Sequence, residues 1–467
     1  MPFQRMSLKR FFLSRIFFSP AGFILSTSLL FLPSPVRANL SIIKKSIVDY
    51  NLEQHQKSLA NGAYRGEEGI LMLAPEVGRS FGLTVQLDQH YLEAGKEFSK
   101  ADKFNKDALR AMKSRKKEKF PGEHVQRIAE SALLHISALE SARKRLTSYR
   151  SGLSPEVDER LDHDICNAML ERLLEESLAL ASYNLREALG YFKNICQGLD
   201  IYSSPLKPGN IRFVNYVFSE FMEKAADDDK ELFDLDRQNR ISHANHKWKR
   251  AIEGTGARYV SIMGPILEEN KKSGYPVDPL LFFALMRQES RFAPKSVSPV
   301  GAVGLTQIMP GTAKDLGMMN VFMPSYLDEA RAFLRRERNL RRQAVALIQE
   351  IREENKLETA RRARDLMQES LDCRDKRKKL YARYKRELLR KGTDDRLNPR
   401  PTIEYGFKYF ATMMENYGGD ISLALAAYNA GPRRIKQFNG IPPYAETVAF
   451  RNRVIGYYRD YLGKLKE

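Results

Sequence analysis

The chain has 467 residues, of which 43% are hydrophobic, and this is enough for two or three domains that each bury a core. Its 28 Gly and 21 Pro do not favour long disordered segments. The 77 Lys and Arg against 58 Asp and Glu give a net charge of +19, which favours polyanionic partners. The sequence shows no zinc-finger spacing and no phosphate-binding glycine loop, so charge alone does not indicate a nucleic-acid protein.

The N-terminus has the pattern of a secretory signal peptide. Basic residues precede a largely apolar run over 16–32, and Val36-Arg37-Ala38 offers small residues where a signal peptidase cuts. We therefore expect residues 1–38 to be removed and the protein to be exported, to the periplasm or the cell envelope. An uncleaved anchor is the alternative, but two prolines interrupt the run and it barely reaches the roughly 20 residues of a membrane span. An exported protein meets no chromosome, so we expect no nucleic-acid partner.

Residues 39–250 are expected to be a helical region of unknown role. Few helix breakers occur in 87–118 and 123–150, and a further stretch from Pro155 to Cys196 carries leucines at helical spacing. This region shows no repeat period and resembles no family that its residues would identify.

The chain has three cysteines, Cys166, Cys196 and Cys373. In an oxidising compartment Cys166 and Cys196 could form a disulfide if the chain folds back between them, and three separate buried thiols are the equal alternative. No Cys or His cluster has metal-ligand spacing, so we expect neither a metal nor another cofactor.

A charged segment at about 325–397 differs from its surroundings. It contains neither Gly nor Pro between Pro324 and Gly392, and residues 328–397 hold 22 basic and 14 acidic side chains. Phe333, Leu340 and Leu347 follow a spacing of seven, which predicts one long helix or a two-helix hairpin that turns near 354–357. Such a segment is usually a solvated arm. The functional alternative is a basic lever that contacts a partner such as a cell-wall or envelope protein, a membrane or an anionic polymer.

One acidic residue stands at the end of a predicted apolar helix. Asp278 followed by Pro279 is a helix start, and Phe282, Leu285 and Glu289 then fall on one stripe. Burial and the negative end of the helix dipole both raise the pKa of a carboxyl at Glu289. A raised pKa is what a general acid requires.

Three further motifs follow in the sequence. In 298–310, glycines permit tight turns, Gln307 offers a donor and an acceptor to a sugar, and Met309 offers a flexible apolar wall. In 418–432, Tyr428 and Asn429 lie at the end of a helix of small residues. In 443–448, Tyr444 is a candidate platform for a sugar ring.

The order of these motifs carries a resemblance. A Glu-Ser pair, then Gly-Leu-x-Gln-x-Met-Pro, then Ala-Tyr-Asn-Ala-Gly-Pro and a late Glu-Thr resembles the soluble lytic transglycosylase family, whose fold is related to goose-type lysozyme. The resemblance covers about 255–462, less the charged insertion. It implies a mainly α protein, with a lysozyme-like catalytic domain at 251–467 placed C-terminal to the helical region.

The resemblance also implies an activity, which is cleavage of the β-1,4 bond between N-acetylmuramic acid and N-acetylglucosamine in peptidoglycan glycan strands, without addition of water. Glu289 would be the single acid and base, and the product would end in a 1,6-anhydro sugar. The resemblance implies that the substrate is contacted by Ser290, Gln307, Met309, Tyr428, Asn429 and Glu446.

The sequence departs from the family pattern at two places, and it leaves two alternative functions. The segment 325–397 replaces a short connection, and Phe450 stands where the family often has Tyr. A hydrolytic muramidase on the same fold and a non-catalytic wall-binding scaffold remain the alternatives.

Overall fold

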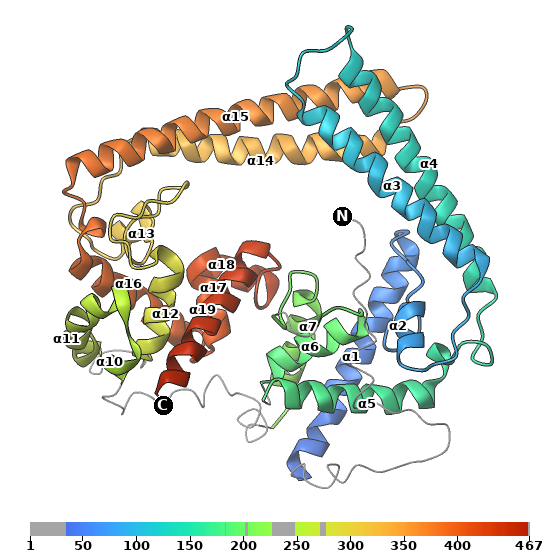
Figure 1. The fold of residues 1–467 in the computed structure, drawn as a ribbon, viewed down its shortest axis with the longest axis horizontal. Helices are drawn as coiled ribbons and strands as arrows, with labels where there is room; N and C mark the ends of the chain where they lie inside the picture. Colours follow the sequence, from blue (N-terminus) through green and yellow to red (C-terminus); the bar gives the residue numbers. More distant parts are fainter. Residues whose placement is uncertain (1–33, 183, 201–203, 227–247, 271–276, 466–467) are drawn as a thin grey trace.

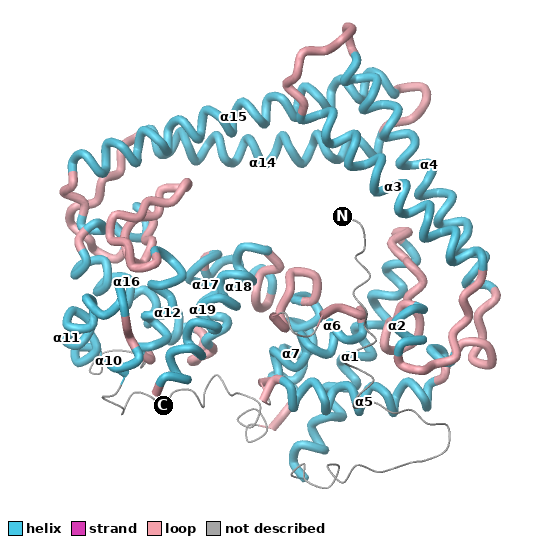
Figure 2. The backbone as a smooth tube through the Cα atoms, viewed as in Figure 1, coloured by secondary structure: helices cyan, strands magenta, loops and turns pink. Residues whose placement is uncertain are grey.

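In a computed structural model of the chain, residues 34–182, 184–200, 204–226, 248–270 and 277–465 are described. They are mostly helical, and the β structure among them is limited to isolated bridges (Figure 2). The prediction of a mainly α fold is confirmed. No helix of the described residues is long and apolar enough to cross a membrane. The expected signal peptide lies outside the described residues, except for 34–38, which begin the first helix.

The N-terminal half consists of a helical body and a long antiparallel hairpin (Figure 1). Its helices are α1 (Ser34–Ala60), α2 (Pro75–Ser80), α3 (Gln89–Lys113), α4 (Glu123–Ser151), the 3₁₀ helix η3 (Glu159–Leu161), α5 (His163–Leu180), α6 (Leu185–Cys196) and α7 (Ile211–Lys224). The hairpin is α3 and α4. Asp88 caps α3 by accepting a hydrogen bond from the backbone N–H of Tyr91. The buried face of α3 is largely alanine, so α4 can approach closely.

The C-terminal half has the same two parts, a body and a hairpin. Its helices are α10 (Trp248–Ala251), the 3₁₀ helix η5 (Gly254–Tyr259), α11 (Val260–Asn270), α12 (Pro279–Ser290), α13 (Pro310–Asp315), α14 (Tyr326–Glu350), α15 (Lys356–Lys391), the 3₁₀ helix η6 (Asp395–Leu397), α16 (Pro399–Asn416), α17 (Ile421–Ala430), α18 (Pro432–Phe438) and α19 (Ala445–Lys464).

The predicted charged insertion forms the second hairpin. Its two helices are α14 and α15, and they turn at 351–355, slightly before the predicted position. Asn355 stabilises this turn by accepting a hydrogen bond from the backbone N–H of Arg352. Gly392 ends α15 in the left-handed conformation, with φ of 67°.

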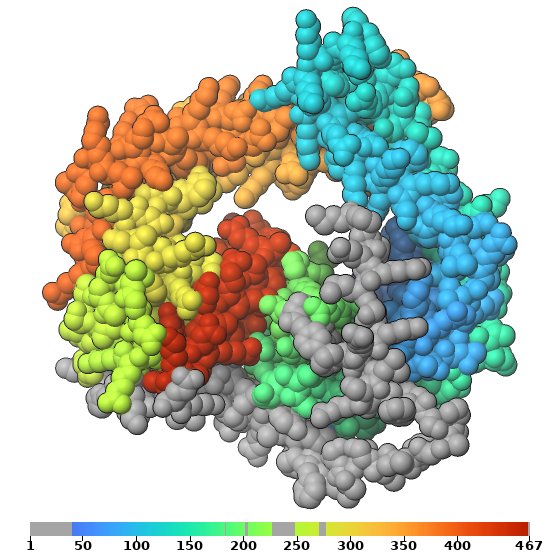
Figure 3. Space-filling model, viewed as in Figure 1, coloured from blue at the N-terminus to red at the C-terminus, as the bar shows by residue number. Residues whose placement is uncertain are grey.

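The two bodies and the two hairpins form a ring. The hairpins run from their own bodies and meet at their tips, at the upper right of Figure 1, and the space-filling view leaves an opening inside the ring (Figure 3). One continuous apolar cluster extends from α1 through α19 and joins the two bodies. At this junction the buried carboxylate of Glu187 forms ion pairs with Arg451 and Arg459.

The three cysteines are buried free thiols in this structure. The pairing of Cys166 with Cys196, which the sequence left open, is therefore not formed.

Candidate functional site

The helix that carries Glu289 begins at the predicted cap. The carboxylate of Asp278 accepts a hydrogen bond from the backbone N–H of Leu280 at 2.8 Å and another from the hydroxyl of Tyr458 at 2.7 Å. Phe282 and Leu285 on the predicted stripe are fully buried. Glu289 follows in the last turn of α12 and is only partly exposed.

The setting of Glu289 disfavours its charged form. Burial, and to a smaller extent the charge of Glu446, raise the pKa of the Glu289 carboxyl to about 8. Among the described residues, no side chain donates a hydrogen bond to the carboxylate or pairs with it. The carboxyl is therefore mostly protonated at neutral pH, as a general acid must be.

The loop that follows α12 is a tight turn fixed by glycine. Val303 and Ile308 pair through two backbone hydrogen bonds of 3.2 Å. Gly304 between them has φ of 85°, and a Cβ at this position would lie 2.0 Å from the carbonyl oxygen of Arg396. Only glycine fits such a close approach of two backbones.

Gln307 lies in this turn with φ of 49°. Its side-chain amide nitrogen donates to the carbonyl oxygens of Ser296, at 3.2 Å, and Gly304, at 2.8 Å. The donor half of this side chain therefore holds the loop, and the acceptor half alone remains for a ligand. The sequence predicts that both the donor and the acceptor of the Gln307 side chain are available to a sugar, and the structure leaves only the acceptor.

Tyr428 and Asn429 connect α17 to the rest of the site. The Tyr428 hydroxyl donates to the carbonyl oxygen of Thr306 at 2.7 Å, and its ring packs against Tyr409 and Phe410. Burial raises the pKa of Tyr428 well above its ordinary value, and the charge of Glu289 raises it further. The side-chain oxygen of Asn429 accepts a hydrogen bond from Thr447 at 2.8 Å, which ties α17 to α19.

The remaining predicted residues differ in how they are placed. The hydroxyl of Ser290 is buried and donates to the carbonyl oxygen of Met286 at 3.1 Å, so it stabilises its own helix. Met309 is partly exposed at the start of α13. Tyr444 is 38% exposed and packs edge-on against Phe438, with 5.5 Å between ring centroids. Glu446 is exposed in the first turn of α19.

Glu289 is thus close enough to Tyr428 and to Glu446 to interact electrostatically with each of them, and Gln307 and Asn429 hold the surrounding elements. No hydrogen bond or ring contact of the described residues joins Met309 or Tyr444 to Glu289. Phe450 is 3% exposed, so the position where the family often has Tyr belongs to the core here.

The structure adds a support that the sequence did not reveal. Arg396 is fully buried and forms a fork with Asp394, and it donates to the hydroxyl of Tyr384 at 2.7 Å and to the carbonyl oxygen of Ile308 at 3.3 Å. It therefore ties the hairpin to the turn that carries Gln307. In the sequence, Arg396 looks like one more basic residue of a charged segment. Thr306 stood inside the recognised motif, and its hydroxyl donates to the carbonyl oxygen of Thr402 at 2.9 Å.

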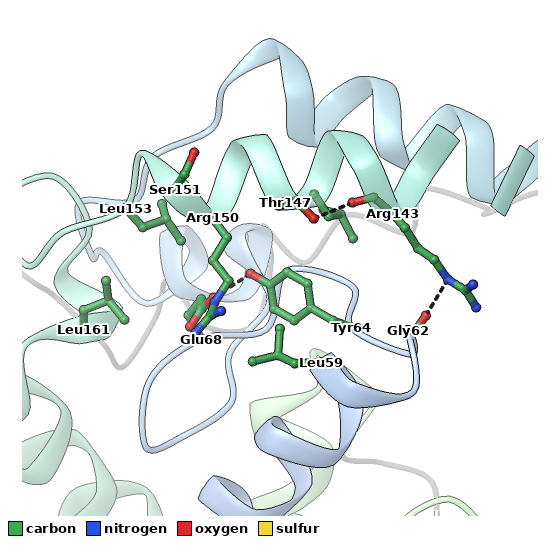
Figure 4. Close-up of a pocket in the computed structure, with 11 residues that line it drawn as sticks. Leu59, Gly62, Tyr64, Glu68, Arg143, Thr147, Arg150, Ser151, Leu153 and Leu161 are labelled. Atoms are coloured by element: carbon green, nitrogen blue, oxygen red, sulfur yellow. Dashed lines mark hydrogen bonds and ion pairs between the residues drawn. The ribbon is translucent and has the colours of Figure 1, made fainter. Parts of the chain in front are cut away.

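A pocket of about 460 Å³ lies in the other half of the chain, between α4 and the loop after α1 (Figure 4). Polar side chains that line the pocket interact with one another. The carboxylate of Glu68 accepts a hydrogen bond from the hydroxyl of Tyr64, and one of its oxygens lies 3.5 Å from Nε of Arg150. In the described part of the chain, no group of three or more acidic, His or Cys side chains could hold a metal ion.

The C-terminal half is a helical domain that places a carboxyl of raised pKa at the end of a buried helix, and a carboxyl in an apolar setting is also the general acid of lysozyme. The family model for the transglycosylase SLT domain matches residues 266–333 and 375–446, so the C-terminal half carries a domain of the SLT type. The match is interrupted where the α14–α15 hairpin is inserted.

Two curated proteins show the same similarity over short stretches. The chain is 45% identical over 51 residues to a transglycosylase of Enterobacteria phage PRD1, which covers 11% of this chain and 19% of the phage protein. It is 25% identical over 197 residues to the soluble lytic murein transglycosylase of Salmonella typhimurium, covering 39% of this chain and 20% of that protein. The chain thus matches about a fifth of the length of each relative.

Two solved structures match most of the chain at low scores. They are the 70 kDa soluble lytic transglycosylase SLT70 of Escherichia coli, with 15% identity and a TM-score of 0.28, and an inactive mutant of the lytic transglycosylase Slt of Pseudomonas aeruginosa, with 14% identity and a TM-score of 0.27. The matches cover 93% and 92% of this chain, and 73% of each of those chains.

Proposed function

We propose that this protein is an exported peptidoglycan lytic transglycosylase. It cleaves the β-1,4 bond between N-acetylmuramic acid and N-acetylglucosamine, and leaves a 1,6-anhydro end. The observation that carries the proposal is the carboxyl of Glu289, whose pKa is raised to about 8 within a domain of the SLT family.

In this reaction Glu289 acts twice. It first donates its proton to the glycosidic oxygen as the bond from C1 breaks. The carboxylate then accepts the proton of the 6-hydroxyl of the muramic acid, whose oxygen forms the new bond to C1. Glu289 ends protonated, as it began, and no water is consumed. A carboxyl that is close to half-ionised at mildly alkaline pH can perform both steps.

The other site residues would position the sugar. Gln307 presents its amide oxygen, Met309 and Tyr444 present apolar surface, and Tyr428 and Asn429 hold the end of α17 against the turn and α19. Ser290 would act through its own helix. Glu446 would keep the pKa of Glu289 high.

A hydrolytic muramidase is the second candidate, because Glu446 is a second carboxylate near Glu289. Glycosidases that use two carboxylates place them on either side of the bond. The two candidates differ in the product, since the anhydro fragment is lighter than the hydrolytic fragment by one water.

The test is digestion of purified sacculi by the parent and by Glu289→Gln, with mass analysis of the fragments. We expect the parent to release anhydro fragments and Glu289→Gln to release none while still binding sacculi. Glu404→Gln, which changes an exposed carboxylate on α16, is the control and should digest as the parent does. Fragments heavier by one water would support the muramidase, and a parent that binds without releasing fragments would support a wall-binding scaffold.

A further inference from the structure

The turn that carries Gln307 occurs a second time in the chain. In the N-terminal half, Glu68 and Leu73 pair through two backbone hydrogen bonds of 3.1 Å, as Val303 and Ile308 do 235 residues later. The two turns share three left-handed positions, which are Gly66, Gly69 and Met72 at φ of 98°, 74° and 54°, and Gly301, Gly304 and Gln307 at φ of 93°, 85° and 49°. Both turns continue into a short helix that begins with proline, α2 and α13.

The buried arginine fork is also duplicated. Arg160 binds Asp158 and donates to the hydroxyl of Tyr149 at 2.7 Å, and its carbonyl oxygen would lie 1.8 Å from a Cβ at Gly69. The second fork has the same bonds, made by Arg396, Asp394 and Tyr384, and it opposes Gly304 in the same way.

The order of elements repeats as well. The helices α1, α2, α3, α4, η3, α5, α6 and α7 correspond in order to α12, α13, α14, α15, η6, α16, α17 and α19, and α18 has no counterpart between α6 and α7 among the described residues. Each half inserts its hairpin at the same point, between the short proline-led helix and the 3₁₀ helix, and α3 and α14 both have 25 residues. The caps agree too, because Asn184 and Asp420 each accept a hydrogen bond from the backbone N–H three residues later.

The N-terminal half lacks the chemistry of the site. Glu53 is the one carboxylate in residues 51–60, at the end of α1, and its side chain is 51% exposed and paired with Lys57. Phe192 is buried at the position of Tyr428, and Lys193, at the position of Asn429, donates to Asn51 at 3.0 Å. No carboxyl in this half has the setting of Glu289 among the described residues.

The two hairpin tips pack against each other through corresponding faces. The apolar contact is formed by Ala108, Ala111, Met112, Val125, Ile128, Ala129 and Ala132 from α3–α4 and by Ala344, Leu347, Ile348, Ile351, Ala360, Ala363 and Met367 from the second hairpin. Ala108 and Ala344 are both fully buried and occupy the same place in the two copies. Beside them Arg115 binds Asp372 at 2.6 Å and Asp375 at 2.7 Å.

We infer that residues 40–225 are a second, catalytically silent copy of the SLT domain, whose role is to hold the catalytic copy through the paired hairpin tips. The tip cluster is an intramolecular interface with pseudo-twofold symmetry, and it closes the ring opposite the junction at Glu187. The description of this copy as silent rests on the proposed function, whereas the duplication and the interface do not.

The interface is tested in the full chain by Ala344→Glu and Ala108→Glu, which place a charge in the apolar tip. We expect both variants to show a larger radius of gyration in X-ray scattering and at least about tenfold faster proteolysis of both hairpins. Val345→Glu is the matched control, because Val345 is 39% exposed on the same helix, and it should behave as the parent. Parental scattering and parental cleavage rates for the two tip variants would overturn the inference.

A milder pair of variants keeps the test valid if the tip variants do not fold. Arg115→Glu places a third negative charge beside Asp372 and Asp375, and we expect it to speed hairpin proteolysis a few-fold. Adding Asp372→Arg and Asp375→Arg should restore the parental rate. Failure of this exchange to restore the rate would contradict the assigned contact.

The silence of the N-terminal copy has its own test. Glu289→Gln and the double variant Glu289→Gln with Glu53→Gln are compared in sacculus digestion, and neither should release fragments. Residual release by the single variant that disappears in the double variant would show chemistry in the N-terminal copy and overturn the inference. Residual release that is the same in both would contradict the proposed role of Glu289 and leave the duplication unaffected.

Discussion

At the residue scale, the proposed role of Glu289 predicts that its pKa sets the pH dependence of the reaction. Because the acid form is needed first and its pKa is about 8, kcat/KM should fall as the pH rises through 8. The charge of Glu446 contributes to this pKa, so Glu446→Gln should move the alkaline limb to lower pH. Rates of fragment release between pH 5 and 10 check both statements. An alkaline limb at the same pH in Glu446→Gln and in the control Glu404→Gln would show that Glu446 does not act on Glu289.

The same carboxyl makes the stability of the protein depend on pH. In the unfolded chain Glu289 ionises near its ordinary value of 4.5, whereas the folded chain keeps its proton up to about 8. Burial of this carboxyl therefore costs no stability below pH 4.5. As the pH rises from 4.5 to 8, its contribution lowers the free energy of unfolding progressively. Gln does not titrate, so Glu289→Gln should become more stable than the parent across this window, by about 2 to 4 kcal/mol at pH 8. Denaturant unfolding at pH 4.5 and pH 8 measures the difference, and equal differences at the two pH values would contradict the burial of this carboxyl.

The place of Glu289 at the end of a buried helix stripe could be predicted from the sequence, because the signals for it are local. The Asp278-Pro279 cap and the spacing of Phe282 and Leu285 place the side chain on a buried stripe. The hydrogen bond from the side-chain amide of Gln307 to the carbonyl oxygen of Ser296 could not be predicted, because the two residues become neighbours only when the turn closes. The same holds for Arg396, whose partners come from three separate segments.

At the scale of elements, the duplicated turn offers a comparison between two glycines. Gly304→Ala should destabilise the protein by at least about 2 kcal/mol and lower activity, because it adds backbone strain to a clash with Arg396 in the turn that carries Gln307. Gly69→Ala meets the same clash, with Arg160, and should cost similar stability. Below the unfolding temperature, however, Gly69→Ala should retain near-parental activity.

Gly311→Ala is the control for both glycine variants, since its added Cβ meets nothing within 4 Å and its φ is not positive. Thermal unfolding and sacculus digestion are measured on all three variants. Loss of activity in folded Gly69→Ala equal to that of Gly304→Ala would show that the two copies are not separable in function.

The absence of Gly and Pro and the seven-residue spacing of Phe333, Leu340 and Leu347 predicted either one long helix or a two-helix hairpin, and the structure has the hairpin of α14 and α15. These signals predict that the segment is helical and how long it is. They do not predict the turn at 351–355, which the side chain of Asn355 stabilises in the structure. Which face of the hairpin would be covered could not be predicted, because half of the tip cluster comes from residues more than 200 positions earlier in the sequence.

At the scale of the whole molecule, the sequence concealed the duplication and showed no repeat period. The positions that fix the shared shape are few, chiefly the glycines of the turn, the Arg-Asp fork and the caps, and corresponding side chains elsewhere in the two copies differ. One such change explains the pocket in Figure 4. Leu146 and Glu68 stand where Tyr381 and Val303 fill the corresponding space in the C-terminal copy. A fold can persist through such exchanges because total volume and pattern matter more than identity.

The net positive charge gives the last prediction, which concerns how the whole molecule meets the cell wall. It is +19 for the full chain and 19 − 5 = +14 once residues 1–38, with five basic and no acidic side chains, are removed. If attraction to an anionic polymer contributes to binding, sacculus binding of Glu289→Gln should weaken as salt rises from 50 to 500 mM, because added ions screen exposed charges over about 10 Å or less. The exposed basic face of α14 tests where this attraction acts. Its residues are Arg335, Arg338, Arg341 and Arg342.

Replacing these four arginines by Glu should weaken binding at low salt and flatten its salt dependence. The matched control makes the same change of charge on α3, at Lys96, Lys100, Lys103 and Lys106. If both sets weaken binding equally, the attraction follows net charge alone and α14 is simply a solvated arm. If only the α14 set does so, the hairpin of the catalytic copy is the basic lever that contacts the wall, and the silent copy holds that lever in position.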